Sequence, residues 1–275
     1  MSIPSISDVR KHLIADPGKP FDLSSRDSGD RSLFEDKSLA KTSLKKDAAV
    51  INELKDILYA EKKRSILVVL QGMDTAGKSG TIKSVFADTT PLGMEVKAFK
   101  APSSNELARD YLWRIHNAVP KKGHVGIFDR SHYEDVLVVK VRGFASPEDI
   151  EKRYEQINAF EEHLSENGVT IVKCMLNIGY EEQGIRLRER LEEQHKYWKF
   201  NPADLDDRAL WKDYMSAYET AVQRCSTKHS PWYVIPSDSR TRRSAMIARL
   251  VRGALEEMDL SWPKSDYRLE DFDFS

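Results

Sequence analysis

The sequence predicts an α/β fold: a mainly parallel, five-stranded sheet with helices on both faces. Short runs of β-branched and apolar residues recur along the chain, and helical patterns of apolar residues lie between them. Strands that alternate with helices form parallel sheets covered on both faces. In addition, residues 72–79 have the spacing of a phosphate-binding loop, with a strand pattern before them and a helix pattern after them.

The first part of the chain has no clear periodicity. Residues 1–40 are rich in Asp, Ser, Pro and Gly, and only residues 21–23 and 33–34 provide apolar anchors. We expect an extended arm here, without helix or strand. Apolar residues then recur at helical spacing over residues 40–63, which predicts an amphipathic helix that leads into the first strand.

The rest of the chain alternates between the two patterns. We expect strands at residues 64–70, 95–99, 125–129, 169–175 and 232–236. We expect helices after residue 79 and at residues 106–118, 133–141, 147–167, 183–199, 209–228 and 242–258.

The loop at residues 72–79 has the composition of a phosphate cradle. Gly72 and Gly77 allow backbone angles that other residues avoid, so the main chain can approach an anion. The helix that follows directs its N-terminal dipole at the same point. Lys78 can reach phosphate oxygens, and the Ser79 hydroxyl can ligate Mg²⁺. We expect phosphate contacts from Gly72, Ala76, Gly77, Lys78, Ser79 and Gly80.

Asp74 is an unusual member of such a loop, because its carboxylate repels a phosphate unless a cation lies between them. It is therefore either a metal ligand or a group that orients the phosphoryl acceptor.

A second carboxylate, Asp129, ends an apolar strand. A lone Asp at this position is most simply a helix N-cap. In a chain with a phosphate-binding loop, however, the neighbouring strand typically ends in the carboxylate on the metal side. We therefore expect Asp129 and Asp74 to lie on either side of a metal ion. Arg130, the next residue, could neutralise charge on a transferring phosphoryl group.

The helix expected after the fourth strand is strongly basic. Arg186 and Arg190 are four residues apart and so share one helix face. Because parallel strands end at the phosphate site, this helix could fold over it as a lid. The alternative is a solvated charged helix whose arginines pair with nearby glutamates.

Composition limits the possible classes of function. Lys and Arg total 43 against 44 Asp and Glu, a net charge of −1, so no overall field attracts nucleic acid or membrane. Cys174 and Cys225 are too few for a disulfide framework. The N-terminus lacks a basic segment followed by an apolar one, and no run approaches 18 apolar residues. We expect a cytoplasmic protein.

Four segments in order, residues 72–78, 110–114, 129–133 and 183–200, resemble the polyphosphate kinase 2 family, and the likeness covers roughly residues 15–262. The resemblance implies a thymidylate-kinase-like α/β/α sandwich of the P-loop kinase type with a helical lid at about residues 181–212. We accordingly expect an arm at residues 1–40, a phosphotransferase domain at residues 41–262 and a tail at residues 263–275.

The resemblance also implies an activity: reversible phosphoryl transfer between inorganic polyphosphate and nucleotides. It implies Mg²⁺ as cofactor, with Mn²⁺ as an alternative. The pair Glu134 and Asp135 is similar to the subgroup that phosphorylates both nucleoside monophosphates and diphosphates. The expected nucleotides are AMP, ADP and ATP, with GMP and GDP as further candidates, and the expected assembly is a homodimer or homotetramer.

The family pattern assigns roles to individual residues. Asp74 and Asp129 correspond to paired metal carboxylates, which Ser79 would join. Lys78 corresponds to the loop lysine. Polyphosphate contacts fall to Arg130, Arg186 and Arg190, and nucleotide contacts to Lys100, Arg109, Arg114 and Glu134.

Two alternatives to this function are an ATP-dependent nucleoside-monophosphate or small-metabolite kinase on the same fold, and a P-loop switch or ATPase module. The acidic residue Asp74 within the loop and the basic lid favour polyphosphate over the first alternative. The second is disfavoured because the sequence lacks the Asn-Lys-x-Asp guanine motif and an Asp-x-x-Gly switch after the third strand.

Overall fold

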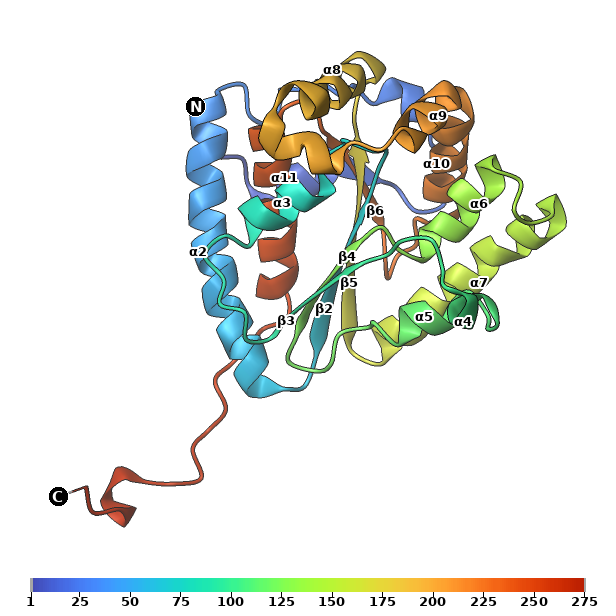
Figure 1. Cartoon of the computed structure of the whole chain (residues 1–275). Helices are drawn as coiled ribbons and strands as arrows, with labels where there is room; N and C mark the ends of the chain where they lie inside the picture. Colours follow the sequence, from blue (N-terminus) through green and yellow to red (C-terminus); the bar gives the residue numbers. More distant parts are fainter. Residues whose placement is uncertain (1, 275) are drawn as a thin grey trace.

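The computed structural model describes residues 2–274 of the chain, and its centre is a six-stranded sheet (Figure 1). The strand order is β1-β6-β5-β2-β4-β3, in which β1 is antiparallel to β6 and all other neighbours are parallel. The strands are β1 (Ile14–Ala15), β2 (Ser65–Gln71), β3 (Met94–Ala98), β4 (Val125–Asp129), β5 (Val169–Asn177) and β6 (Trp232–Pro236).

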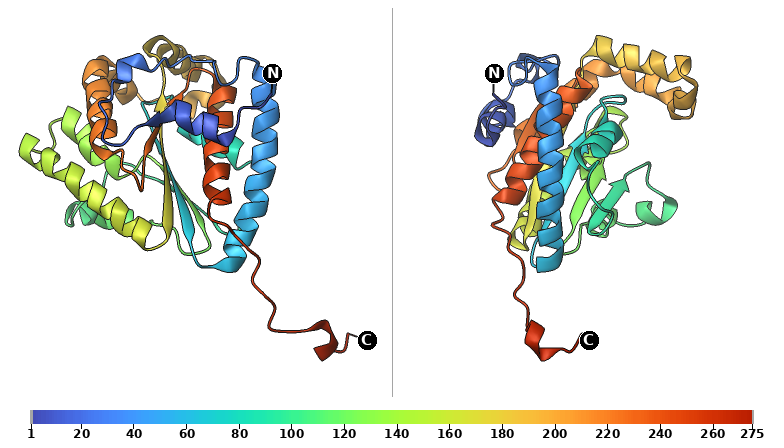
Figure 2. Two further views of the ribbon diagram at one scale, coloured as in Figure 1. Left: turned by 180° about the vertical axis from the view of Figure 1, so that it is seen from behind. Right: turned by 90° about the vertical axis from the view of Figure 1, so that its left-hand side faces the viewer.

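Helices cover both faces of the sheet, and a third group lies over its carboxyl edge (Figures 1 and 2). One layer contains α1 (Ile6–Leu13), α2 (Lys37–Glu61), α3 (Lys78–Val85) and α11 (Arg240–Glu256). The other contains η2 (His132–Val136), α6 (Val138–Val141), α7 (Pro147–Glu166) and α10 (Trp211–Cys225), with the short helices α4 (Ser104–Leu107) and α5 (Trp113–His116) near its lower end. Over the edge lie α8 (Tyr180–Glu192), η3 (Gln194–Lys199) and α9 (Ala203–Ala209), which we call the lid.

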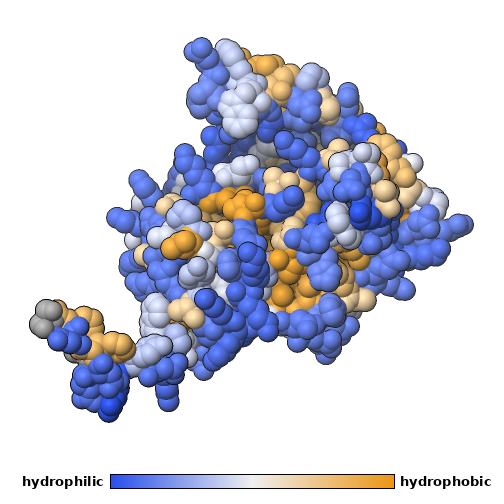
Figure 3. All heavy atoms as spheres, turned by 60° about the horizontal axis from the view of Figure 1, so that its bottom comes forward, coloured by the Kyte–Doolittle hydropathy of each residue, from blue (hydrophilic) through white to orange (hydrophobic). Residues whose placement is uncertain are grey.

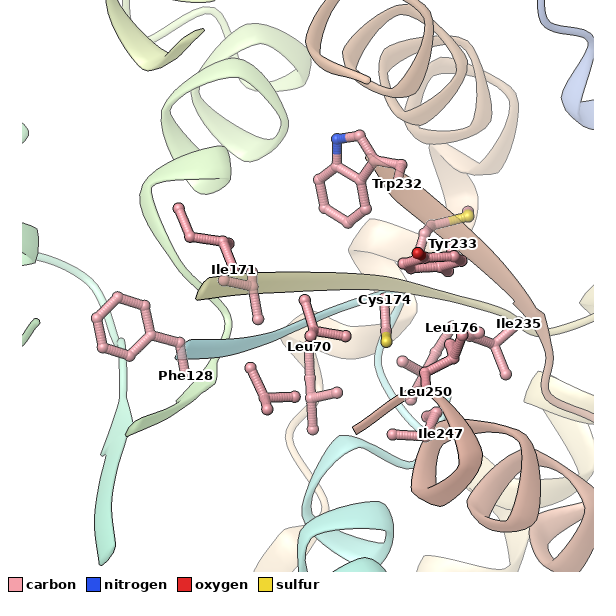
Figure 4. Close-up of a cluster of buried hydrophobic side chains, with 14 of the residues drawn as sticks. Leu70, Phe128, Ile171, Cys174, Leu176, Trp232, Tyr233, Ile235, Ile247 and Leu250 are labelled. Carbon is pink, nitrogen blue, oxygen red and sulfur yellow. The ribbon is translucent and has the colours of Figure 1, made fainter. Parts of the chain in front are cut away.

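The core lies on both sides of β5 and β2. Figure 4 shows Cys174 and Leu176 of β5 pointing towards Ile247 and Leu250 of α11, whereas Trp232 points to the opposite face. All five side chains are at most 2% exposed. Strands buried on both faces require continuous apolar runs, which is why β2 and β5 were recognisable in the sequence.

The α/β class and the mainly parallel sheet predicted from the sequence are confirmed, but the strand count of five was wrong. The sixth strand, β1, comes from the segment expected to be an extended arm, and it pairs Ile14 with Tyr233 and Ala15 with Trp232. The helix α1 precedes it and begins with a capping box in which Ser5 and Asp8 bond each other's backbone. A helix and a strand therefore lie within the expected arm.

The helix predicted at residues 183–199 breaks at Glu193, between α8 and the 3₁₀ helix η3. Two further predicted helices are interrupted. The helix predicted at residues 106–118 forms only the single turns α4 and α5. The helix predicted at residues 133–141 starts as the 3₁₀ helix η2, and Leu137, with φ −107° and ψ −90°, separates it from α6. In both cases an apolar periodicity persists although the backbone leaves the helical conformation.

The end of the chain leaves the body of the protein. After α11, residues 259–274 lead away from it and include the short 3₁₀ helix η4 (Leu269–Asp271) (Figure 1). Figure 3, a view from below, shows apolar side chains gathered near the middle of the lower face of the molecule, surrounded by hydrophilic ones.

None of the helices within residues 2–274 combines the length and the apolar character that crossing a bilayer requires.

A buried ionic cluster connects β5 to the segment after β4. The Lys173 ammonium donates to Glu161 Oε2 (2.5 Å), Tyr133 Oη (2.8 Å) and the Cys225 carbonyl (2.7 Å). Glu161 Oε1 is also bonded to Tyr133 Oη and to His132 Nε2. Burial favours protonation of Glu161, but Lys173 and His132 hold its pKa at about 2. The cluster fixes the backbone directly after Asp129 and Arg130.

We predict that Glu161→Leu lowers the free energy of unfolding by about 3–5 kcal/mol, because it leaves the buried Lys173 ammonium without a counter-charge. Urea denaturation measures this change. The exposed neighbour Glu162 provides the matched control, Glu162→Leu, which should stay within about 0.5 kcal/mol of the wild type.

The effect of Glu161 should also depend on pH. Its folded pKa of about 2 lies below the value of about 4.3 for an unfolded chain. The stabilisation is therefore complete above the unfolded pKa and is lost as the pH falls towards the folded one. The difference between wild type and Glu161→Leu should shrink between about pH 5 and about pH 2; a difference that does not change with pH would contradict this account.

Candidate active site

The centre of the site is the turn between β2 and α3. Gly72 has φ +155° and Gly77 has φ +106°, both outside the range that L side chains readily adopt. Neither position has room for a side chain: a Cβ on Gly72 would lie 2.8 Å from the Leu176 carbonyl oxygen. Thr75 also has a positive φ, +66°. The predicted loop therefore forms between a strand and a helix as expected.

Lys78 folds back over the loop. Its ammonium donates to the carbonyl oxygens of Gly72 (2.7 Å) and Met73 (3.3 Å), and the side chain is buried. Burial and the nearby Arg130 guanidinium lower the pKa of Lys78, against the opposing effect of neighbouring carboxylates. Lys78 is thus held at the mouth of the loop, where an anion would compete with the two carbonyls for its protons.

Ser79 and Asp129 meet across the loop. The Ser79 hydroxyl donates to Asp129 Oδ2 at 3.1 Å. This contact joins the first turn of α3 to the end of β4, as the order of the parallel strands leads one to expect, because β4 is the neighbour of β2. Two oxygen ligands suited to a hard cation therefore lie side by side.

Arg130 links both sides of the site. Its guanidinium donates to Asp74 Oδ1 (2.7 Å) and to Glu134 Oε2 (3.1 Å). The backbone of Arg130 has φ +65°, a left-handed conformation that costs about 1–2 kcal/mol for a residue with a side chain. That strain turns the side chain back over the P-loop instead of along the direction of β4.

The charges of the site compensate one another. Burial favours the neutral form of Asp74, but Lys78, Arg130 and Arg190 together hold its pKa below the usual range. Asp74 is therefore a carboxylate surrounded by cations. These cations would also attract the transferring phosphoryl group, which is anionic.

The structure changes the role of Ala76. Its backbone N–H donates to the Met73 carbonyl at 3.1 Å and is not directed at a ligand. At the start of α3, by contrast, the first internal bond runs from Thr81 N to Gly77 O (2.9 Å). The N–H groups of Lys78, Ser79 and Gly80 precede that bond, so they have no acceptor within the helix and form the anion-facing part of the loop.

The residues predicted to bind the nucleotide divide into two groups. Glu134 lies at the site through its bond to Arg130. Arg114 donates to the Lys100 carbonyl (2.9 Å), whereas Arg109 donates to Asn105 and stacks on Trp113 at 4.3 Å. Lys100 and Arg109 are exposed and Arg114 is half-buried, so the three form a group beyond the end of β3. Among the described residues, none of the three is hydrogen-bonded to the P-loop.

The two lid arginines differ, although both lie on α8. Arg186 is buried and donates to the carbonyls of Thr75 (3.1 Å), Ser237 (2.9 Å) and Asp238 (2.7 Å), and to Glu182 (2.7 Å). In this structure the guanidinium of Arg186 is bound to protein oxygens and holds the loop in place. Its role as a polyphosphate contact stays a prediction.

Arg190 is the lid arginine nearer the site. It donates to Asp204 Oδ2 (2.5 Å) and to the Lys199 carbonyl (3.0 Å), and its charge lowers the pKa of Asp74. Its bonds lie within the lid, so it can still face a ligand over the P-loop.

Sequence reasoning missed several residues of the site. Asp204 of α9 lies close enough to Asp74 that burial and this carboxylate together raise its pKa to about 6. A hollow beside Asp74, Arg130 and Glu134 is lined in addition by Asp207, Tyr214 and Tyr218. Asp204 and Asp207 belong to α9 of the lid, and Tyr214 and Tyr218 belong to α10, which follows it. None of them is part of a sequence motif, so only the folded chain brings them to the P-loop.

Comparisons with known proteins agree with this geometry. The family model described as Polyphosphate kinase 2 matches residues 34–263. The chain is 42% identical over 262 residues to an AMP/ADP-polyphosphate phosphotransferase of Meiothermus ruber, covering 94% of this chain and 97% of the relative. It is 35% identical over 260 residues to an ADP-polyphosphate phosphotransferase of Rhodopseudomonas palustris, covering 90% of each.

A solved structure is also similar. The crystal structure of polyphosphate kinase 2 from Arthrobacter aurescens TC1 superimposes with a TM-score of 0.92 at 39% sequence identity, covering 98% of this chain and 96% of that one.

The geometry of the lid arginines predicts that their substitutions separate. Arg186→Ala should lower the free energy of unfolding by at least about 2 kcal/mol, because buried carbonyls lose a charged donor. Arg190→Ala should cost less than Arg186→Ala, because the raised pKa of Asp204, about 6, lets this carboxyl take up a proton when it loses its partner, and should weaken binding of inorganic tripolyphosphate. Thermal unfolding and calorimetric titration measure the two effects; a fully stable Arg186→Ala that loses only tripolyphosphate would restore the original assignment.

Proposed function

The chain belongs to the polyphosphate kinase 2 family, and we propose that it transfers phosphoryl groups reversibly between inorganic polyphosphate and nucleotides, converting AMP to ADP and ADP to ATP. The observation that carries the proposal is the Arg130 bridge to Asp74 and Glu134, which joins the P-loop to the segment after β4. It concentrates cationic donors and carboxylates where a phosphoryl group would pass between a chain and an acceptor.

In this reaction the terminal phosphates of the polyphosphate lie at the P-loop, beneath the lid. An oxygen of the acceptor phosphate attacks the terminal phosphorus in line, and the bond to the bridging oxygen of the chain breaks. The nucleotide gains one phosphoryl group, and the polyphosphate becomes one unit shorter. The acceptor is largely ionised at neutral pH because its second pKa is about 6, so no protein base is needed. Lys78 and Arg130 stabilise the charge that moves to the leaving oxygen.

A divalent cation, Mg²⁺ or Mn²⁺, fits the oxygens at the loop. We propose that Asp129 and Ser79, which lie 3.1 Å apart, hold it together with the nearby Asp74. Within residues 2–274, no group of three or more His, Cys, Asp and Glu side chains is arranged to hold a metal. Phosphate oxygens and water would then complete the coordination, as is usual for Mg²⁺. Such an ion neutralises phosphate charge during transfer.

The finer features of the activity stay predictions. Glu134, at the site, supports the use of both nucleoside mono- and diphosphates, with GMP and GDP as further acceptors beside the adenine nucleotides. The group formed by Lys100, Arg109 and Arg114 is our candidate for nucleotide contacts at the approach to the site. A homodimer or homotetramer and a cytoplasmic location are predictions from the sequence.

The central prediction concerns products. Purified protein incubated with Mg²⁺, polyphosphate and either AMP or ADP, without ATP, should form ATP from both acceptors. Chromatography of the nucleotides measures the products. Omission of polyphosphate is the control. ATP from ADP alone would remove the dual-acceptor assignment. If nothing forms with polyphosphate but AMP is phosphorylated from ATP, the enzyme is instead an ATP-dependent kinase.

We further predict that Asp129→Asn reduces turnover about 100-fold or more in both directions, because the loop loses the carboxylate that balances the metal charge. The amide is nearly isosteric and can still accept the Ser79 hydrogen bond, so thermal stability should stay close to that of the wild type. Steady-state rates at saturating Mg²⁺ test this, and near-normal rates would exclude Asp129 as a metal ligand.

A further inference from the structure

Two buried arginines hold the P-loop from the side opposite its mouth. Arg243 of α11 is 2% exposed; it donates from Nη1 to the Ala76 carbonyl and from Nε to Thr81 Oγ1, both at 2.9 Å. Arg186 donates to the carbonyl of Thr75, the preceding residue. Carbonyl oxygens of the loop therefore point into the protein, towards positive charge. The N–H groups at the start of α3 are left to face outward.

Arg243 differs from Arg186 in its charge balance. Arg186 has a carboxylate partner, Glu182, at 2.7 Å. Within the described residues, Arg243 has no carboxylate partner, and its two hydrogen bonds go to a hydroxyl and a carbonyl oxygen. A buried guanidinium without a counter-charge is costly, and proteins usually pair such a group.

The unpaired guanidinium lies directly against the glycines of the loop. A Cβ on Gly77 would be 2.2 Å from Arg243 Nη1, and a Cβ on Gly80 would be 3.6 Å from Nη2. Gly77 is therefore required not only for its φ of +106° but also because Arg243 occupies the space of a side chain. The guanidinium therefore packs directly against the backbone of the loop at Gly77.

We propose that Arg243 is a positioning residue for phosphoryl transfer. It holds a carbonyl of the P-loop towards the protein interior, and the bound polyphosphate provides the negative charge that no carboxylate of the protein provides. This inference rests on the proposed placement of the chain at the P-loop. It assigns to α11, which follows β6 and lies far from every motif in the sequence, a direct part in holding the loop.

The electrostatics of Arg243 agree with this role. Burial lowers its pKa to about 9, and the charges of Arg186 and Arg240 act in the same direction. An anion on the other side of Gly77 and Gly80 would favour the charged guanidinium and in turn be attracted by it, since the two effects are reciprocal.

The test measures binding of inorganic tripolyphosphate, in Mg²⁺ and without nucleotide, to four forms of the full chain: the wild type, Arg243→Met, Arg243→Lys and Arg252→Met. Arg252 is the matched control because it lies on the same helix and pairs with the buried Asp47 and with Glu256, away from the P-loop. Calorimetric titration gives the dissociation constants, and thermal unfolding shows that each form is folded.

We expect Arg243→Met to weaken tripolyphosphate binding about tenfold or more, Arg243→Lys to recover part of the loss because it restores the charge but not the fork, and Arg252→Met to bind like the wild type. In steady-state assays the KM for polyphosphate should rise in Arg243→Met while the KM for AMP changes little. A merely structural defect would weaken both substrates together.

Several results would overturn the proposal. Equal tripolyphosphate affinities for Arg243→Met and Arg252→Met would show that the anion does not sense this charge. If Arg243→Met is unfolded, Arg243→Lys becomes the deciding variant. Wild-type affinity of Arg243→Lys for tripolyphosphate, together with a raised KM for AMP, would contradict the assigned role. If the wild-type protein binds AMP but no tripolyphosphate, polyphosphate does not bind at the P-loop. That result would overturn both the proposed placement of polyphosphate and this inference.

Discussion

The turn between β2 and α3 is the constraint on which the rest of the site depends. Gly72 and Gly77 adopt backbone angles that side chains resist, and each is closely covered by other parts of the protein, the Leu176 carbonyl and the Arg243 guanidinium. The turn thereby directs carbonyl oxygens inward and the N–H groups of the first turn of α3 outward. Because parallel strands end at one edge of the sheet, Asp129 and the lid, which leaves β5, necessarily meet this turn.

A protein with a net charge of −1 can still have a strong local electric field, because several of its cationic side chains gather at the carboxyl edge of the sheet. Arg130 is shared between Asp74 and Glu134, and Lys78 is held by loop carbonyls. These contacts keep the cations in place without a ligand and avoid unpaired buried charge. They are also contacts that phosphate oxygens can replace, so the pairing maintains the site in a form ready for a polyanion.

The sequence was sufficient for those parts of the site that depend on local spacing. The loop pattern and the apolar run ending at Asp129 predicted that Asp129 faces the loop, because a strand beside the loop typically ends in a carboxylate. The structure agrees on this point through a different partner, since the Ser79 hydroxyl donates to Asp129. The strand β1 was missed because two residues carry no periodicity, although the Ser5 and Asp8 capping box was a readable signal for α1.

Other parts of the site depend on tertiary packing that one sequence does not encode locally. Asp204 and Arg243 reach the P-loop from segments that are more than one hundred residues away along the chain. Neither belongs to a recognisable motif, and both resemble ordinary members of charged helices. Buried polar groups are positioned by what surrounds them, and the surroundings are known only once the elements have packed.

Arg186 and Arg190 show the limit most clearly. Four residues apart on one helix, they looked equivalent in the sequence, and periodicity indeed places them on one face. Their environments nevertheless differ: Arg186 is bonded to carbonyls of the P-loop and of the segment after β6, whereas Arg190 is bonded within the lid, to Lys199 and Asp204. The first turns of α8 are thus bonded to the P-loop and to the segment after β6. Arg190, one turn further along α8, makes its polar contacts within the lid. Arg190, and not Arg186, is therefore the arginine through which the lid can present charge to a ligand.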